Sequence, residues 1–317
     1  MILSVSRRTD IPAFYSDWFF NRVKAGMYQY RNPMVPTSIY EVPLNPKNVD
    51  CIVFWTKNPL PMLERLHILD ERGFRYYFTY TLNGYGADME PNVAPLEQRI
   101  KTFQRLAKLI GKNRVIWRYD PVVLTTKYDM DFHCERFAYL ASQLFDSTEK
   151  CVFSFVDLDY KNTKEGNKQG IVYLPFSKKL MVDLAAKFAE IAHKHGLRLA
   201  TCAEAIDLEK LGIEHNCCID KSLIEDICGY KLKVGKDASQ RKECHCVESI
   251  DMGANNTCLH GCKYCYANYM PAVVVKNRSK HDPEFPMLLK EHYIGDHVEQ
   301  KKKTDSLRIC SVQGKLF

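Results

Sequence analysis

The sequence lacks the features that mark membrane and secreted proteins. It contains no run of about 18 apolar residues, the length that a membrane-spanning helix needs. Residues 1–8, Met-Ile-Leu-Ser-Val-Ser-Arg-Arg, do not have the basic-then-apolar layout of a signal peptide. There is also no repeat of solenoid period and no low-complexity tract. We therefore expect a globular, cytoplasmic protein that has no membrane partner.

The chain is long enough and apolar enough to bury a large core. Its 317 residues are 46% hydrophobic and 26% charged, which is ordinary for a globular protein. The formal net charge of +7 is mildly basic, so it permits a phosphate-containing or nucleic-acid partner without requiring one. The lysine run at residues 301–303 fits a solvated surface better than a binding patch.

Cysteine, in contrast, is abundant, with 13 residues in the chain. Because no signal peptide is found, we expect these cysteines to be metal ligands or reduced core thiols rather than disulfides. Cys258, Cys262 and Cys265 form a C-x3-C-x2-C pattern within residues 257–268. A loop with this spacing can direct its thiolates towards one point. Three thiolates can hold three irons of a [4Fe–4S] cluster and leave the fourth iron open.

Other residues of this loop suit a buried metal centre. Gly261 can adopt the backbone angles of a tight turn, and Tyr264 and Tyr266 would shield a cluster from solvent. The alternative is a zinc knuckle, which needs four ligands, and His260 offers the fourth.

Six apolar segments predict strands, at residues 2–6, 51–55, 76–81, 115–119, 151–156 and 197–201. They alternate with predicted helices at residues 16–25, 61–71, 96–110, 131–145 and 177–195. This alternation indicates parallel βα units and an α/β fold, for which we expect a full or partial parallel (β/α) barrel of the TIM type. Residues 1–228 would form the barrel-like domain. Residues 229–317 would form a Cys-rich, cluster-binding segment and tail that pack on the barrel mouth as part of one structural unit.

Polar side chains directly follow several of these predicted strands. In parallel βα folds, the site lies beyond the carboxyl ends of the strands. An aspartate at such a position can also be an ordinary helix N-cap, but the set together predicts a polar pocket. A buried arginine in this set would need an anionic partner, either a nearby carboxylate or a ligand. The candidate residues are Arg7, Asp10, Lys57, Asn58, Arg118, Asp120 and Glu204.

The cysteine loop, with Tyr264 before its third cysteine, resembles the cluster loop of radical S-adenosylmethionine (radical SAM) enzymes. The resemblance implies a barrel of the radical SAM type in which SAM chelates the open iron and is cleaved to a 5′-deoxyadenosyl radical. Residues 54–58 and 118–121 are similar to strand-end motifs of the spore photoproduct lyase branch. Over nearly the whole chain, residues 6–10, 54–58, 117–121 and the loop resemble the uncharacterised family DUF1848, which brings no established substrate.

Two features depart from the usual radical SAM pattern. The loop follows the barrel-like part instead of the first strand. Residues 247–251 would therefore be the strand before the loop, and pairing with residues 2–6 would place the cysteines over the same barrel mouth. The Gly-Gly-Glu run that many members use for the SAM amino group is absent, and residues 83–86 are only a weak substitute.

A second pair of cysteines, Cys244 and Cys246, lies shortly before the loop. We hypothesise that they join Cys202, at the end of the sixth predicted strand, and Cys217 in a second metal site. Four sulfurs would suffice for a closed [4Fe–4S] cluster or a structural zinc. The alternative is that Cys202 and Cys217 are packed core thiols.

The sequence thus predicts an iron–sulfur, SAM-dependent radical enzyme of unknown substrate. The predicted catalytic groups are Lys57, Arg118, Asp120 and Glu204, and the predicted cofactor contacts are Arg7, Asp10, Asn58 and Tyr264. The substrate would be a small molecule or a nucleic acid, with a lyase or repair reaction, and ferredoxin or flavodoxin would donate the electron. Two alternatives stay open: a non-enzymatic zinc or iron–sulfur protein for metal binding or electron transfer, and a barrel hydrolase or lyase with a structural metal.

Overall fold

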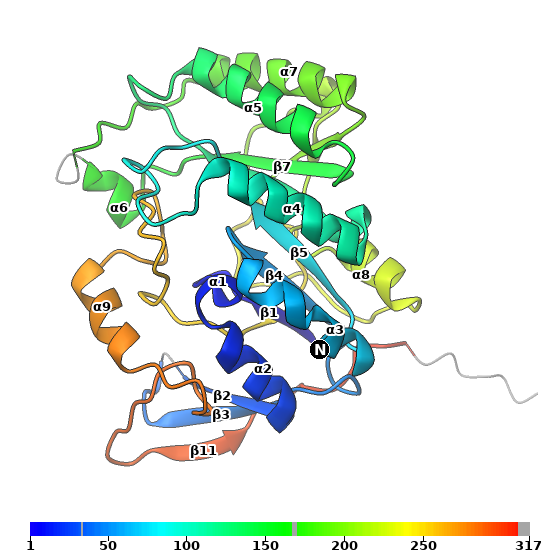
Figure 1. Cartoon of the computed structure of the whole chain (residues 1–317), viewed down its shortest axis with the longest axis vertical. Coiled ribbons are helices and arrows are strands. Elements are labelled where there is room, and N and C mark those ends of the chain that lie inside the picture. The colour runs from blue at the N-terminus through cyan, green and yellow to red at the C-terminus, as the bar shows by residue number, and fades with distance from the viewer. Residues whose placement is uncertain (33, 167–169, 310–317) are drawn as a thin grey trace, which may run out of the picture.

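One large sheet organises the chain, which a computed structural model describes at residues 1–32, 34–166 and 170–309 (Figure 1). Its eight strands are parallel to their neighbours, in the order β10-β1-β4-β5-β6-β7-β8-β9. They are β1 (Ile2–Val5), β4 (Cys51–Thr56), β5 (Tyr76–Thr81), β6 (Val115–Val122), β7 (Lys150–Phe155), β8 (Arg198–Thr201), β9 (Glu214–His215) and β10 (Ile250–Asp251). The predicted α/β class is confirmed. Within the described residues, β9 and β10 are the two edges and do not pair to close the sheet.

Helices follow most strands, as the alternation predicted. They are α1 (Ile11–Phe14), α2 (Ser16–Ala25), α3 (Leu66–Glu71), α4 (Leu96–Ile110), α5 (Met130–Leu144), α6 (Lys161–Lys164), α7 (Lys178–Lys194), α8 (Lys221–Cys228) and α9 (Pro271–Ser279), with 3-10 turns η1 (Leu60–Arg65), η2 (Lys112–Arg114) and η4 (Glu209–Leu211). Side-chain caps explain two starts: Asp129 accepts from Phe132 N and Ser177 accepts from Leu180 N. The predicted end of the fourth strand was wrong, because β6 continues through Asp120 to Val122 with a shift of register.

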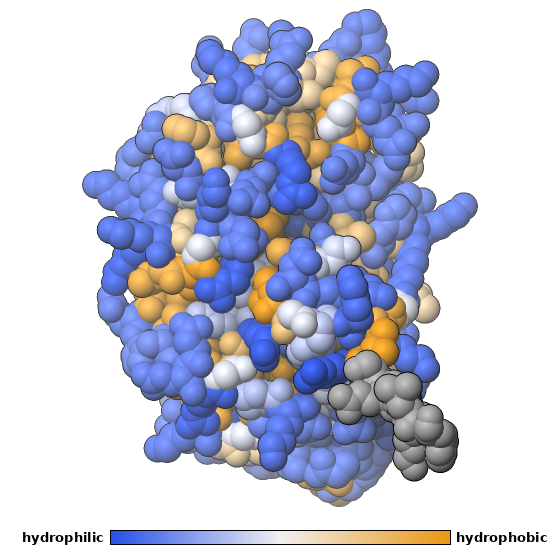
Figure 2. All heavy atoms as spheres, turned by 90° about the vertical axis from the view of Figure 1, so that its right-hand side faces the viewer, coloured by the Kyte–Doolittle hydropathy of each residue, from blue (hydrophilic) through white to orange (hydrophobic). Residues whose placement is uncertain are grey.

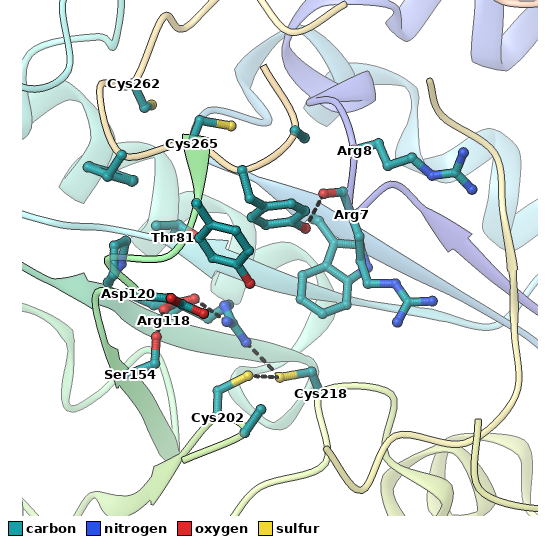
Figure 3. A pocket seen from close by; sticks show the side chains of 18 of the residues that line it. Arg7, Arg8, Thr81, Arg118, Asp120, Ser154, Cys202, Cys218, Cys262 and Cys265 are labelled. Atoms are coloured by element: carbon teal, nitrogen blue, oxygen red, sulfur yellow. Dashed lines mark hydrogen bonds and ion pairs between the residues drawn. The ribbon is translucent and has the colours of Figure 1, made fainter. Parts of the chain in front are cut away.

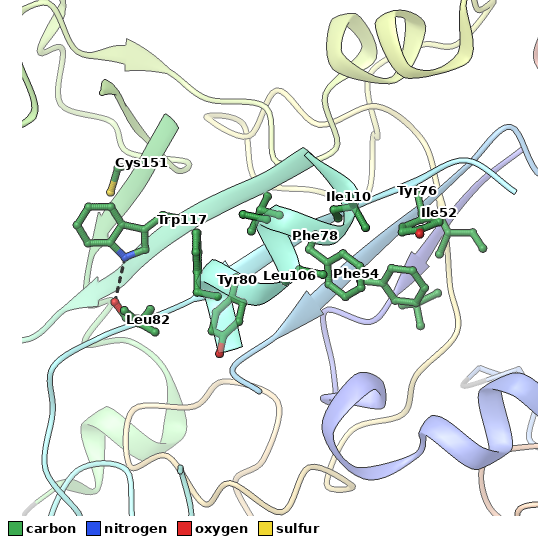
Figure 4. Close-up of a cluster of buried hydrophobic side chains, with 14 of the residues drawn as sticks. Ile52, Phe54, Tyr76, Phe78, Tyr80, Leu82, Leu106, Ile110, Trp117 and Cys151 are labelled. Atoms are coloured by element: carbon green, nitrogen blue, oxygen red, sulfur yellow. Dashed lines mark hydrogen bonds between the residues drawn. The ribbon is translucent and has the colours of Figure 1, made fainter. Parts of the chain in front are cut away.

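Both faces of the sheet are buried, which explains why its strands are apolar without alternation. On one face, Phe54, Phe78 and Trp117 belong to a core that includes side chains of α2, α4 and α5 (Figure 4). On the other face, Val53 and Tyr77 pack against a second core built from α8 and the cysteine-rich chain that follows it. The second face is therefore covered by residues that come after the sixth predicted strand.

A small second sheet joins the two ends of the chain. Strand β2 (Met27–Arg31) pairs antiparallel with β3 (Ser38–Pro43) in a hairpin. Strand β11 (His297–Gln300) adds to β3 in parallel. Residues 229–317 thus contribute β10 to the large sheet and β11 to the small one (Figure 1).

The surface seen in Figure 2 is mainly hydrophilic, with smaller apolar areas between the polar side chains. None of the described helices combines the length and the apolar content that crossing a bilayer would require.

Strand β10 positions the cysteine loop that follows it. Leu3 and Ser4 of β1 pair with Ile250 and Asp251, so the predicted parallel pairing of these segments is confirmed over β10. Gly253, just after β10, packs directly on the end of β1. A Cβ atom at Gly253 would lie 2.1 Å from Ser6 Oγ and 2.7 Å from Ser6 Cβ. Glycine is therefore required for the chain to leave β10 at this distance from β1.

We expect Gly253→Ala to destabilise the fold. Ser6 Oγ donates a 2.7 Å hydrogen bond to Asp251 Oδ1 and accepts a 3.0 Å bond from Arg8 N, so it cannot turn away without losing them. The expected loss is about 1–3 kcal/mol, the usual cost of overpacking, measured by denaturant unfolding. Gly235→Ala is the matched control, because no heavy atom lies within 4 Å of a Cβ there. Equal effects of the two substitutions would contradict the close packing.

Candidate functional site

A cavity of about 420 Å³ lies at the carboxyl ends of the central strands. Its walls come from the ends of β4, β5, β6 and β7, from the segments after β1, β4, β7 and β8, and from the cysteine-rich residues that cover them (Figure 3). The predicted site residues that line it are Arg7, Asp10, Lys57, Arg118, Asp120, Cys202, Cys244, Cys246, Cys258, Cys262, Tyr264 and Cys265. Asn58, Glu204 and Cys217 are not among its lining residues.

Two of the residues outside the cavity have local roles in the described chain. Asn58 Oδ1 accepts a 3.3 Å hydrogen bond from Leu60 N, so it caps the turn after β4. The Glu204 carboxylate accepts a 2.8 Å bond from Phe155 N at the end of β7. Burial raises the pKa of Glu204 to about 7.

The loop that carries Cys258, Cys262 and Cys265 is fastened to the segment after β5. Lys263 N donates a 3.0 Å hydrogen bond to Met89 O, and Asn92 N donates a 3.1 Å bond to His260 O. Gly261 has a φ of 69°, which confirms the predicted need for glycine. Three cysteines from one short loop therefore line one cavity.

His260 in this loop is engaged at both ring nitrogens. Its Nε2 donates a 2.8 Å hydrogen bond to Asp10 Oδ2, and its Nδ1 lies 3.5 Å from Asn92 O. Binding of a metal to Nε2 would break the bond to Asp10. The arrangement therefore disfavours a zinc knuckle in which His260 binds the metal through Nε2.

Asp10 is the residue that connects the loop to the sheet. Besides His260, its carboxylate accepts hydrogen bonds of 2.7 Å from Thr56 Oγ1 and 2.7 Å from Lys57 N at the end of β4. It also accepts a 3.0 Å bond from Ala13 N and so caps α1. Asp10 thus holds the end of β4, the start of α1 and the cysteine loop in one arrangement.

A buried charge network lies beside the loop. Lys57 Nζ is 2.8 Å from Glu90 Oε1 and donates a 3.0 Å hydrogen bond to Tyr264 Oη. Arg99 Nη1 lies 3.6 Å from Glu90 Oε2, and Tyr264 donates to the same carboxylate. Burial opposes ionisation, but Lys57 and Arg99 outweigh it and lower the pKa of Glu90. Asn83 Nδ2 reaches the Tyr264 hydroxyl at 3.2 Å.

Sequence reasoning missed Glu90. It named residues 83–86 in the loop after β5 and not the acidic residue further along the same loop. The sequence did offer one signal for Glu90: it is a carboxylate in the loop after β5, which also contains Asn83. Its pairing with Lys57 could not be read from spacing, because the loop has to fold back onto β4 to make it.

Arg118 and Asp120 form the second charged group of the cavity. The sequence left a carboxylate or a ligand open as the partner of a buried arginine, and here Arg118 Nη2 donates to Asp120 Oδ2. Asp120 Oδ1 accepts from Ser154 on β7, and the Arg118 guanidinium lies 5.2 Å from the ring centroid of Trp55. The other end of the guanidinium, Nη1, lies 2.7 Å from Cys218 Sγ, a neighbour that the sequence did not indicate.

The second group of cysteines differs from the predicted set by one residue. Cys202, Cys244 and Cys246 line the cavity together with Cys218, whereas Cys217 does not. The two cysteines are adjacent in the chain, but only Cys218 faces the cavity. Cys202 Sγ and Cys218 Sγ are 3.2 Å apart.

A separate group of possible ligands lies outside the cavity. Single ligand atoms of Asp207, Glu209 and His215 lie within 4.8 Å of one another. Asp207 and Glu209 are exposed, and exposed carboxylates often stand close together without an ion.

Fold and cavity together define an α/β protein with a parallel sheet and a cysteine-lined site at its strand ends. The model of the family described as "Domain of unknown function (DUF1848)" matches residues 2–267, and the chain belongs to this family. No curated protein matches the chain.

Among solved structures, the chain is similar to a proposed alpha-L-fucosidase from Bacteroides thetaiotaomicron. The two are 10% identical, with a TM-score of 0.24, and the match covers 56% of this chain and 71% of the other. A likeness at this level carries no information about the activity of this chain.

We expect Glu90→Gln to destabilise the protein strongly. The substitution leaves the buried charges of Lys57 and Arg99 without a carboxylate, and removing one partner of a buried pair costs about 3–5 kcal/mol. The measurement is the free energy of unfolding in denaturant.

The matched control is Glu64→Gln, whose partner Arg105 and own side chain are 47% and 76% exposed. It should change stability by less than about 1 kcal/mol, as exposed pairs do. A loss at Glu90 no larger than at Glu64 would show that the carboxylate does not hold the two cations.

Proposed function

We propose that this protein is an iron–sulfur, SAM-dependent radical enzyme whose [4Fe–4S] cluster is held by Cys258, Cys262 and Cys265. The observation that carries the proposal is that these three cysteines line one cavity, while Nε2 of His260, which lines it too, is bonded to Asp10. Three thiolates without a fourth protein ligand leave one iron open for a small molecule. The proposal includes a partial (β/α) barrel of the radical SAM type and the resemblance to the spore photoproduct lyase branch.

The donor set and its surroundings fit such a cluster. Cysteine thiolates are the usual ligands of iron–sulfur clusters. A cluster with its thiolates is anionic, and the ammonium group of Lys57 interacts with Cys262 from the end of β4. Lys57 is itself held by Glu90 and Tyr264, so its position beside the loop is defined. When SAM is bound, the cluster would supply a carbon radical. The protein would position the target C–H bond and exclude water.

The remaining polar residues have roles that follow from their contacts. Asp10 orients the cysteine loop through His260 and orients Lys57 through its backbone N–H. Arg118 and Asp120, paired on the floor of the cavity, offer a cation and a carboxylate to the polar groups of a substrate or of SAM. The substrate is a small molecule or a nucleic acid, and the electron comes from a donor such as ferredoxin or flavodoxin.

The alternative of a barrel hydrolase or lyase has less support. Lys57 is paired with Glu90 and Asp120 is paired with Arg118, so neither is poised as a free general base. Glu204, the third candidate of that hypothesis, does not line the cavity. A simple electron carrier, in turn, has no need of a cavity with paired charges at the strand ends.

The experiment is anaerobic reconstitution with iron and sulfide, followed by EPR spectroscopy of the reduced protein with and without SAM. We expect about four irons in the loop site and a signal that shifts when SAM is added. The triple substitution Cys258→Ala, Cys262→Ala and Cys265→Ala should abolish the shift. Cys134→Ala, on α5 and outside the cavity lining, is the matched control and should leave it unchanged. A reduced signal that does not respond to SAM, or zinc in place of iron, would refute the proposal.

A further inference from the structure

A second cysteine group shares the cavity with the loop but comes from other parts of the chain. We propose that Cys202, Cys218, Cys244 and Cys246 form a second metal centre, closed by four thiolates. Figure 3 shows Cys202 and Cys218 on the far side of Arg118 and Asp120 from Cys262 and Cys265. The occupant is a thiophilic centre, zinc or an iron–sulfur cluster, because four thiolates complete the coordination of either. This centre does not depend on the proposed radical chemistry.

The sheet brings the first two cysteines together. Cys202 directly follows β8, and Cys218 follows β9, which pairs with β8 in parallel. Parallel neighbours end at the same edge of a sheet, so residues just past their ends meet. The two Sγ atoms are accordingly 3.2 Å apart, although the residues come from different strands.

The C-x-C pair is held over the same edge by backbone contacts. Val247 N donates a 3.2 Å hydrogen bond to Ile219 O, and Ile219 N donates a 3.3 Å bond to Cys246 Sγ. Cys244 and Cys246 line the same cavity as Cys202 and Cys218. Four cysteines from three segments of the chain therefore line one cavity, and two of them are in contact.

N–H donors surround two of these sulfur atoms. Cys218 Sγ accepts from Arg118 Nη1 at 2.7 Å and from Asn216 Nδ2 at 3.1 Å, and Cys246 Sγ accepts from a backbone N–H. A neutral thiol is a weak acceptor, whereas a thiolate accepts strong, charge-assisted bonds. Donors of this kind orient metal-bound ligands and tune the charge of the centre.

Several thiolates beside one another need compensating positive charge, and Arg118 lies next to them. Cys218, Cys244 and Cys246 are only 5%, 8% and 4% exposed, so water screens their mutual repulsion poorly. Arg118 supplies one compensating charge, and its other nitrogen is committed to Asp120. A metal centre supplies the remainder. Since Arg118 contacts both Cys218 and Asp120, a change of charge at this centre would also be felt at the carboxylate on the cavity floor.

The test uses the full chain in which Cys258, Cys262 and Cys265 are all alanine, so that only the second group can hold metal in the cavity. Metal is counted per chain after isolation and again after anaerobic reconstitution with iron and sulfide. We expect this protein to retain either about one zinc or about four irons, and each result identifies the occupant. Because the loop ligands are absent, retention would stand even if the proposed SAM chemistry fails.

Two neighbouring substitutions in that protein make the assignment specific. Cys218→Ala should lower the metal content at least fivefold, and Cys217→Ala, the matched control, should leave it unchanged. If the triple variant folds poorly, the metal contents of Cys218→Ala and Cys217→Ala are compared in the chain with an intact loop instead. A metal-free triple variant with native circular dichroism would overturn the proposal, as would equal losses for the two substitutions. A Cys202–Cys218 disulfide found by mass spectrometry in anaerobically isolated protein would overturn it as well.

Discussion

The parallel pairing of β10 with β1 is the contact on which the site depends. A strand from late in the chain lies at the edge of the sheet beside the first strand, and the cysteine loop follows it directly. The Asp251 carboxylate fastens this edge, because it accepts hydrogen bonds of 2.8 Å from Ser4 Oγ, 2.7 Å from Ser6 Oγ and 2.9 Å from Arg7 N. Without this pairing, the three loop cysteines would not stand over the ends of the other strands.

Charge compensation is the second constraint, and it explains the composition of the cavity. Two groups of cysteines approach it from different sides, and each lies beside a buried cation: Lys57 near the loop and Arg118 near Cys218. Each cation also has its own carboxylate, Glu90 or Asp120. The pairs keep the lysine and the arginine charged in a poorly solvated place, so that anionic sulfur can be accommodated there.

The order and bounds of many helices and strands could be predicted, because they depend on residues close together in the sequence. Helices α2 and α4 and strand β5 have the predicted bounds, since glycine after a helical period and an apolar run between turns act over a few residues. The edge pairing of β10 was also predictable, because a cysteine loop at a strand end needs a strand before it. The helix expected at residues 61–71 is divided into the 3-10 turn η1 and the helix α3.

The sequence by itself determined the parallel α/β architecture, the cysteine loop and the position of Lys57 directly after β4, because periodicity and spacing are local properties. Only the tertiary structure decided that Glu90 is the partner of Lys57 and that Cys218, not Cys217, faces Cys202. The first depends on how the loop after β5 folds back onto β4, and the second on which of two adjacent side chains faces the cavity. No local preference distinguishes two adjacent cysteines, so the sequence could not tell Cys217 from Cys218.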